Sequence, residues 1–261
     1  MELFDTHAHL AADKFKGDPA GVISRASAAR VLSILSVGVD AATSRQCAEL
    51  AAIWPGVSAS VGIHPCHTLE AAPGDWDEVV KLAQRPEVVA IGETGLDLYW
   101  KEAPLPLQQD YFDRHIGLSQ QTGLPLVIHQ RETTAEILAM LQAAARRGPL
   151  RGIMHSFTGT GEEAQSFLAL GLHISFAGMV TFKKSDDLRA AAATIPSDRI
   201  LIETDSPYLS PEPLRGKHPN EPARVVHTAH CLAQVRGVSL EEFARQTTAN
   251  AKRLLSRQPP P

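Results

Sequence analysis

Four histidines and two carboxylates in this sequence have the residue types and the spacing of divalent-metal ligands. Each one ends or follows a short apolar run of the kind that forms a buried strand: His7, His9, Glu93, His129, His155 and Asp205. Imidazole and carboxylate ligands together suit Zn²⁺, Mn²⁺, Fe or Ni²⁺, and Mg²⁺ is admissible although it prefers oxygen ligands. Six ligands exceed what one tetrahedral ion takes, so we expect two ions that share one carboxylate.

Two ions held in this way would supply hydrolytic chemistry. A bridged pair about 3.5–4 Å apart lowers the pKa of the bridging water and neutralises charge on a phosphoryl group during transfer. Asp205 would hold the nucleophilic water and accept its proton as a general base. Each residue alone has an ordinary explanation, because an isolated strand-end His is usually structural and Glu93 or Asp205 could cap a helix. Their shared position at the ends of strands favours the metal interpretation.

The elements predicted around these residues explain how they could meet. Eight apolar, β-branched runs predict strands at residues 2–6, 31–37, 57–63, 88–92, 125–128, 152–155, 172–176 and 199–202. Helical periodicity covers residues 21–30, 42–53, 75–85, 107–122, 133–146, 162–170, 186–195, 221–235 and 240–256. Eight strand–helix units over this length are typical of a (β/α)₈ barrel, whose active sites lie at the carboxyl ends of the strands.

An open, doubly wound sheet would show the same alternation of strands and helices. Its usual Gly-x-Gly-x-x-Gly turn after the first strand is missing, and Asp5-Thr-His-Ala-His9 stands in that place. In a barrel, His7 and His9 would alternate along an extended chain and both point into the mouth. We therefore predict an α/β fold, a single (β/α)₈ TIM barrel over residues 1–256, followed by a disordered tail at 257–261.

Composition excludes several classes of protein. The 261 residues include 25 Lys and Arg against 29 Asp and Glu, a net charge of −4, and 44% are apolar, which excludes intrinsic disorder. No window approaches about 18 uncharged apolar residues, so we expect no membrane span. Cys47, Cys66 and Cys231 form no C-x-x-C pair and the start lacks a signal-peptide pattern, which favours the cytoplasm. The acidic balance argues against a broad duplex-binding face but not against a small phosphate site.

Six motifs carry the candidate ligands and their neighbours: Phe4-Asp-Thr-His-Ala-His-Leu10, Val61-Gly-Ile-His-Pro65, Ile91-Gly-Glu-Thr-Gly-Leu-Asp97, Leu126-Val-Ile-His129, His155-Ser-Phe-Thr-Gly159 and Leu201-Ile-Glu-Thr-Asp-Ser-Pro-Tyr208. In this order they resemble the TatD family of metal-dependent deoxyribonucleases, which lies within the metal-dependent amidohydrolase superfamily. The resemblance covers about residues 1–255. Gly-Glu-Thr-Gly-Leu-Asp together with Glu-Thr-Asp-Ser-Pro is its most specific part.

The resemblance implies a barrel hydrolase with a divalent metal centre that acts on DNA ends. One ion would be held by His7, His9, Glu93 and Asp205. The second would be held by Glu93, His129 and His155, with Glu93 as the bridge. His64 would lie behind the ligands or contact the substrate phosphate, and Arg215, in an Arg-Gly loop after the last strand, would contact phosphate or substrate.

Three departures from the family pattern concern loops rather than proposed ligands. Cys66 and Ser156 replace residues common in relatives, and residues 217–222 form a stretch about one residue longer than usual. They bear on loop geometry and substrate preference, not on metal binding.

Few cations stand near the predicted mouth: Arg131, Lys183, Lys184, Arg215 and Lys217. So small a set would hold one or two backbone phosphates, which favours a single-stranded 3′ end over a wrapped duplex. Arg131 could instead pair with Glu132 or Glu136. The aromatic residues Tyr99, Trp100 and Tyr208 stand next to motifs and could stack on a base, although packing is the more usual role.

The leading hypothesis is a 3′→5′ exodeoxyribonuclease that acts on single-stranded DNA ends, with Glu93 and Asp205 catalytic and two divalent ions (Zn, Mn, Mg or Ni) as cofactors. A second hypothesis is hydrolysis of a small amide, lactone or phosphotriester on the same scaffold. Relatives of that kind commonly bridge their metals with a carboxylated Lys, whereas Glu93 stands at this position and no Lys follows it until Lys101. A third is a metal-binding protein without catalysis, against which the intact ligand set argues.

Overall fold

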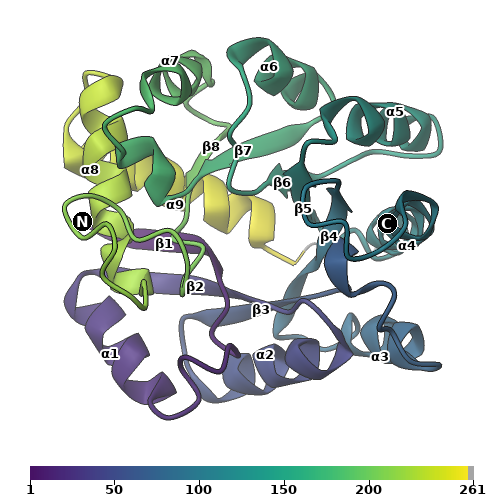
Figure 1. The fold of residues 1–261 in the computed structure, drawn as a ribbon. Helices are drawn as coiled ribbons and strands as arrows, with labels where there is room; N and C mark the ends of the chain where they lie inside the picture. Colours follow the sequence, from purple (N-terminus) through teal and green to yellow (C-terminus); the bar gives the residue numbers. More distant parts are fainter. Residues whose placement is uncertain (258–261) are drawn as a thin grey trace.

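Eight parallel strands form the centre of the molecule in the computed structural model, which describes residues 1–257 (Figure 1). They are β1 Leu3–Ala8, β2 Val31–Val37, β3 Val57–Val61, β4 Val88–Asp97, β5 Leu126–Arg131, β6 Gly152–Met154, β7 Leu172–Phe176 and β8 Ile200–Ile202. Each strand pairs in parallel with the next along the chain, from β1 to β8. This sequential order confirms the (β/α)₈ barrel and excludes the doubly wound sheet.

The seam between the first and last strands is held by few backbone contacts. One parallel bridge joins Ala8 to Ser206, and the amide of Asp205 donates to the carbonyl of His7 at 2.9 Å. The buried Asp5 carboxylate accepts from the amide of Thr204 at 2.9 Å and from its hydroxyl at 2.5 Å. The segment that carries Asp205 is therefore fixed directly to the strand that carries His7.

Helices surround the barrel in the described residues: α1 Pro19–Ala28, α2 Ala41–Ile53, α3 Asp75–Leu82, α4 Leu105–Thr122, α5 Thr134–Ala145, α6 Gly161–Ala169, α7 Asp186–Thr194 and α8 Val225–Val235. Loops contain the 3₁₀ helices η1 Pro65–His67, η2 Gly178–Thr181 and η3 Pro222–Arg224. The sequence pattern does not predict these short helices, and it merges η3 and α8 into one helix at 221–235. Within residues 1–257, none of the helices combines the length and the apolar character that a membrane span requires.

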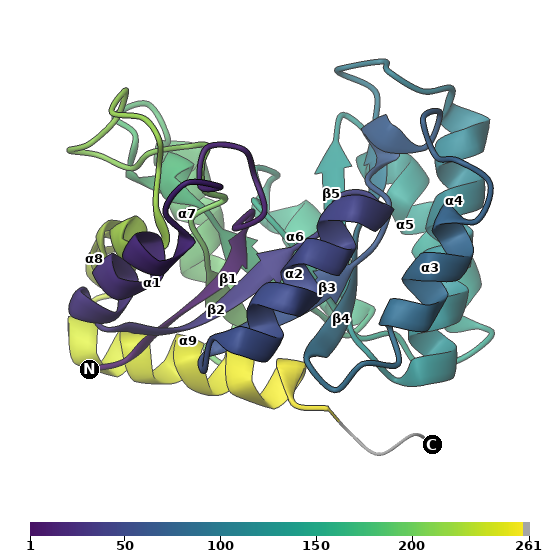
Figure 2. The ribbon, with the colours of Figure 1, turned by 90° about the horizontal axis from the view of Figure 1, so that it is seen from below.

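The last helix, α9 (Leu240–Leu255), closes the amino-terminal end of the barrel. Figure 2 shows it running beneath the strands, opposite the end where the loops gather. Its residues Ala251, Leu254 and Leu255 share one buried apolar cluster with side chains from the strands: Phe4, Leu35, Val37, Ala90, Val127, Ile153 and Leu201. The carboxyl end of the barrel is therefore the open one. The predicted tail lies outside the described residues except for Arg257, which donates to the carbonyl of Ala83 at 3.0 Å.

Strand β4 continues to Asp97, well beyond the predicted end at residue 92. Gly92 and Gly95, both inside this strand, have φ angles of 139° and 140°, a backbone conformation that other residues rarely adopt. A Cβ at Gly95 would lie 2.0 Å from the carbonyl oxygen of His129, so the missing side chain lets β4 approach β5 closely. Glu93 consequently lies within a strand, beside the strand of His129, rather than in the loop that follows.

Candidate metal centre

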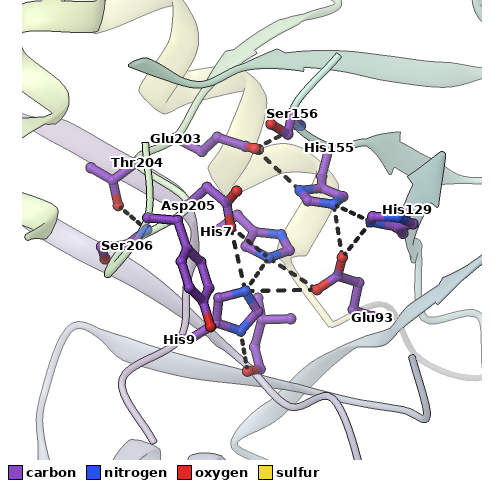
Figure 3. A network of polar contacts seen from close by, with 12 residues as sticks. His7, His9, Glu93, His129, His155, Ser156, Glu203, Thr204, Asp205 and Ser206 are labelled. Atoms are coloured by element: carbon purple, nitrogen blue, oxygen red, sulfur yellow. Dashed lines mark hydrogen bonds and ion pairs between the residues drawn. The ribbon is translucent and has the colours of Figure 1, made fainter. Parts of the chain in front are cut away.

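Glu93, on β4, lies among histidines from four other segments at the carboxyl end of the barrel, and Figure 3 shows His7, His9, His129 and His155 around it. Its side chain is 3% exposed, and its Oε1 lies 2.8 Å from Nε2 of His155 and 3.1 Å from Nδ1 of His129. Oε1 is also 3.4 Å from Nε2 of His64, and Oε2 is 3.3 Å from Nε2 of His7. The barrel thus brings residues from β1, β4 and β5, and from the segments after β3 and β6, around one carboxylate.

His7, His9 and Asp205 form a second group on the β1 side of the same cluster. The Nε2 atoms of the two histidines are 3.2 Å apart, as expected when alternate residues of an extended chain point the same way. Asp205 Oδ1 lies 3.4 Å from Nε2 of His9 and 3.9 Å from Nε2 of His7. Asp205 has a φ of 54°, a left-handed conformation that Asp tolerates better than most residues.

The chemistry of this donor set fits divalent cations. Three groups each place three potential ligand atoms within 4.8 Å of one another: His7 with Glu93 and His155, His7 with His9 and Asp205, and His64 with Glu93 and His129. The Nε2 atoms of His7 and His9 face each other at 3.2 Å, and the carboxylates of Glu93 and Asp205 lie beside them. A shared cation would satisfy both nitrogens and both carboxylates. The cluster is therefore compatible with metal binding.

Two histidines have a carboxylate on the nitrogen that faces away from the centre. Nδ1 of His155 lies 3.3 Å from Oε1 of Glu203, and Nε2 of His129 lies 2.9 Å from Oδ2 of Asp97. Because an ionised carboxylate only accepts, each of these nitrogens carries a proton. When the ring is neutral, its other nitrogen, which faces Glu93, is the one with a free lone pair for a cation. Such carboxylate partners commonly orient metal-bound histidines.

His64 has the opposite arrangement of its ring nitrogens. Its Nδ1 accepts from the amide of Cys66 at 3.1 Å, so a neutral His64 carries its proton on Nε2, which faces Glu93. Burial lowers the pKa of His64 to about 4, which keeps the ring neutral at physiological pH. A protonated Nε2 can donate to a carboxylate or phosphate oxygen but cannot bind a cation. The geometry therefore favours a substrate contact for His64 over a role as ligand.

Sequence reasoning missed the two orienting carboxylates, Glu203 and Asp97. Both are fully buried. Glu203 also accepts from the amide of Ser156 at 2.6 Å, so Ser156, one of the departures from the family pattern, lies beside the centre. The available signal was their position inside the motifs Glu-Thr-Asp-Ser-Pro and Gly-Glu-Thr-Gly-Leu-Asp. The thiol of Cys66 is not given such a role, because burial raises its pKa to about 12 and it stays protonated; Cys66 acts on the cluster only through its backbone amide.

Opposite charges in the cluster shift the pKa values of Glu93 and His155 apart. Burial opposes ionisation of Glu93, but the rings of His155, His64 and His7 hold the pKa of this carboxyl well below its usual range. Burial likewise opposes protonation of His155, but Glu93 and Glu203 raise its pKa well above the usual value. The carboxylates thus keep their negative charge and favour a positive partner among them.

A cavity of about 1490 Å³ opens over the cluster and is lined by five of the six candidate ligands, all except the fully buried His7. Lys14 and Lys16, which sequence reasoning did not consider, line it together with Arg131. Arg215 does not: its guanidinium lies 4.1 Å above the ring of Phe182. The predicted substrate contact of Arg215 therefore gains no support from the geometry, and within residues 1–257 Lys183, Lys184 and Lys217 also lie outside the lining.

A parallel (β/α)₈ barrel with histidines and carboxylates at the carboxyl ends of its strands defines a class, the metal-dependent barrel hydrolases. A family model described as "TatD related DNase" matches residues 4–256, and the chain belongs to this family. The resemblance seen in the six motifs is thereby confirmed.

Individual relatives extend over nearly the whole chain. It is 39% identical over 252 residues to an uncharacterized metal-dependent hydrolase, YabD, of Bacillus subtilis, covering 97% of this chain and 98% of the relative. It is 36% identical over 258 residues to a protein of Erwinia billingiae named "3'-5' ssDNA/RNA exonuclease TatD", covering 97% and 98%. The solved structure of YjjV, a TatD homologue from Escherichia coli, superposes with a TM-score of 0.91 at 26% identity and covers 97% of each chain. The chain is a metal-dependent hydrolase of the TatD family.

Proposed function

We propose that this protein is a two-metal 3′→5′ exonuclease that removes nucleotides from single-stranded DNA ends. The observation that carries the proposal is the position of Glu93, which lies between the His7–His9–Asp205 group and the His129–His155 pair, within 3.3 Å of at least one histidine of each. One carboxylate in that position can serve two ions. The exonuclease name of the Erwinia relative supports the reaction class.

The ligand assignment is the one that the family resemblance implies, and the short distances around Glu93 support it. One ion would be held by His7, His9, Glu93 and Asp205, and the other by Glu93, His129 and His155. When bound, the ions would lower the pKa of a water and offset the charge of the phosphodiester under attack.

Asp205 is the general base of this proposal. Burial opposes its ionisation, but the hydrogen bond with His9 and the charges of His7 and His155 lower its pKa, so that it is ionised at neutral pH and can accept a proton from water. Its side chain is 14% exposed and lines the cavity, whereas Glu93 is almost covered. Asp205 can therefore reach a water that lies on the substrate side.

The remaining groups would hold the phosphate. Nε2–H of His64 can donate to a non-bridging phosphate oxygen, and Lys14, Lys16 and Arg131 add positive charge around the cavity. Asp13, Glu102 and Glu132 line the same cavity and match these three cations in number, so the cavity has no cationic surplus of its own. Such a surface suits one chain end rather than the many phosphates of a duplex.

Oligonucleotides labelled at either end test this function. We expect the protein, freed of metal and then supplied with Mn²⁺, Mg²⁺, Zn²⁺ or Ni²⁺, to shorten a 5′-labelled single strand stepwise and to release the label at once from a 3′-labelled one. An RNA strand, a blunt duplex, a lactone and a phosphotriester complete the substrate panel. Equal activity after chelation, or activity confined to the lactone or phosphotriester, would refute the proposal.

A further inference from the structure

Tyr99, Trp100 and Arg131 form a stacked group beside the metal centre, here called the aromatic–arginine group. The Cζ atom of Arg131 lies 4.0 Å from the centre of the Tyr99 ring and 5.9 Å from that of Trp100. The two aromatic rings are 5.1 Å apart and perpendicular. Tyr99 is 48% exposed and Trp100 is 58% exposed, so neither side chain is part of the core.

A single carboxylate joins this group to the metal centre. Oδ1 of Asp97 accepts from the amides of Tyr99 and Trp100 at 2.8 and 2.9 Å, while Oδ2 of the same residue faces His129. The loop that carries the two aromatic residues is therefore held on the carboxylate that orients a candidate ligand. Because Asp97 is fully buried, it holds the group in a defined place relative to His129.

The group offers the cavity one exposed aromatic side chain and one cation. Trp100 and Arg131 both line the cavity. Within residues 1–257, Arg131 stacks on Tyr99 rather than pairing with Glu132 or Glu136, so the edge of its guanidinium is free to donate. The carboxylates of Glu102 and Glu132 line the cavity as well, which makes this region unsuitable for several phosphates. A nucleotide with one base and one adjoining phosphate fits this combination of an aromatic side chain and a single cation.

We propose that the aromatic–arginine group is a nucleotide subsite, in which Trp100 stacks on a base near the scissile bond and Arg131 contacts the adjoining phosphate. This inference rests on the proposed function. Stacking on an aromatic face tolerates every base, because each has a π surface, so the subsite would recognise single strands without reading sequence. A paired base in a duplex is already stacked on its neighbours and would not be available.

Removal of single bases from the substrate tests the subsite. Four single-stranded oligothymidylates would be prepared, each with a single abasic residue at a different one of the four positions nearest the 3′ end. The kcat/KM for each would be compared with that for the intact strand. For the wild-type protein we expect about a tenfold loss at one position, the size that stacking of one base provides. In Trp100→Ala the intact and abasic strands should react equally. Trp100→Phe should restore part of the difference.

Leu69→Ala is the matched control, because Leu69 is 62% exposed and does not line the cavity. It should discriminate against the abasic strand as the wild-type protein does. Wild-type protein that degrades intact and abasic strands equally, or Trp100→Ala that discriminates fully, would overturn the subsite while leaving the nuclease in place.

Fluorescence of the metal-free protein separates the two hypotheses further. Intact oligothymidylate should quench the fluorescence of Trp100, and the abasic strand should quench it less. The fluorescence of Trp100→Phe gives the background signal of Trp54 and Trp76, which is subtracted. Base-dependent quenching, combined with no hydrolysis of the same strand after Mn²⁺, Mg²⁺, Zn²⁺ or Ni²⁺ is supplied, would support the subsite and refute the proposed function. Quenching that is independent of the base would refute the subsite.

Discussion

At the scale of single residues, the centre depends on the partners of its histidines as much as on the ligand atoms. His155 and His129 are each turned by a buried carboxylate, Glu203 or Asp97, so that the opposite nitrogen faces Glu93. His64 is turned by the amide of Cys66 instead and presents a proton in the same direction. Histidine rings in one cluster therefore differ in whether they present a lone pair or an N–H to Glu93, and the partner of the other ring nitrogen decides which.

We expect Glu203→Gln to weaken metal binding about 10- to 100-fold, because the amide is a poorer partner for Nδ1 of His155 than the carboxylate. Titration of metal-free protein against a fluorescent chelator measures this affinity without any assay of activity. Glu241→Gln, an exposed change in the first turn of α9, is the control and should bind as the wild-type protein does. Unchanged affinity in Glu203→Gln would show that Glu203 does not orient His155.

We expect Asp205→Asn to lose about 10²- to 10⁴-fold in kcat, because the amide cannot accept the proton of the attacking water. Asn has the shape of Asp and also tolerates the left-handed conformation found here, so the fold should be retained. The measurement is kcat on a single-stranded oligonucleotide together with the metal content of the variant. A kcat within threefold of the wild-type value would exclude Asp205 as the base.

The six ligand candidates could be predicted because histidines and carboxylates at strand ends are conspicuous in a sequence. The roles of Glu203 and Asp97 could not be predicted, because in the sequence a buried carboxylate that orients another side chain cannot be told from any other acidic residue until its partner is known. The absence of Arg215 from the cavity has the same origin, since its stacking on Phe182 joins loops whose course the sequence does not define. Contacts between distant segments decide these cases.

At the scale of elements, β4 determines how the two halves of the centre meet. The strand carries Glu93 between Gly92 and Gly95, and both glycines approach the backbone of β5 at distances that a side chain would forbid. The apolar run ends at Gly92, and for that reason the predicted strand stopped there; a glycine inside a strand often marks a close backbone approach, as it does here. The positions of the other seven strands were predicted to within a few residues from their apolar runs alone.

We expect Gly95→Ala to destabilise the fold by more than about 2 kcal/mol and to reduce metal binding, because its Cβ would meet the carbonyl oxygen of His129. Urea unfolding measures the change. Gly117→Ala, within α4 and with open space around it, is the matched control and should stabilise by about 1 kcal/mol or less. Equal stability of the two variants would contradict this close approach of β4 and β5.

Helix α4 is tied to the end of β3 by a histidine whose protonation should affect stability. Nε2 of His115 accepts from the amide of Ile63 at 3.0 Å and Nδ1 donates to the carbonyl of Tyr111 at 2.6 Å, so only the neutral ring fits. Burial lowers its pKa to about 4 in the folded protein, against 6.5 when unfolded. Its contribution is complete above pH 6.5 and is lost as the pH falls toward 4, by at most about 3 kcal/mol.

His115→Gln keeps an acceptor for the amide of Ile63 and removes the titration. Its free energy of unfolding should therefore fall less steeply than that of the wild-type protein between pH 6.5 and 4, as measured by urea unfolding at several pH values. Parallel curves for the two proteins would show that His115 is not the neutral, buried group described here.

At the scale of the molecule, the barrel is closed below by α9 and open above at the metal centre. The chain has a net charge of −4, yet this value includes Glu93 and Asp205, whose charge bound ions would offset. A globally acidic protein can thus receive a phosphate at its mouth. The fold class and the clustering of the candidate ligands were predictable because the order of the strands along the chain fixes where their ends meet.

The most direct test of the account is the number of divalent ions that Glu93 supports. Glu93→Gln keeps the size of the side chain but removes the charge that would join two ions. Elemental analysis after saturation with Mn²⁺ or Zn²⁺ and removal of free metal should give about two ions per wild-type chain and at most one per variant chain. Two ions retained in Glu93→Gln, or a single ion in the wild-type protein, would contradict a bridged pair.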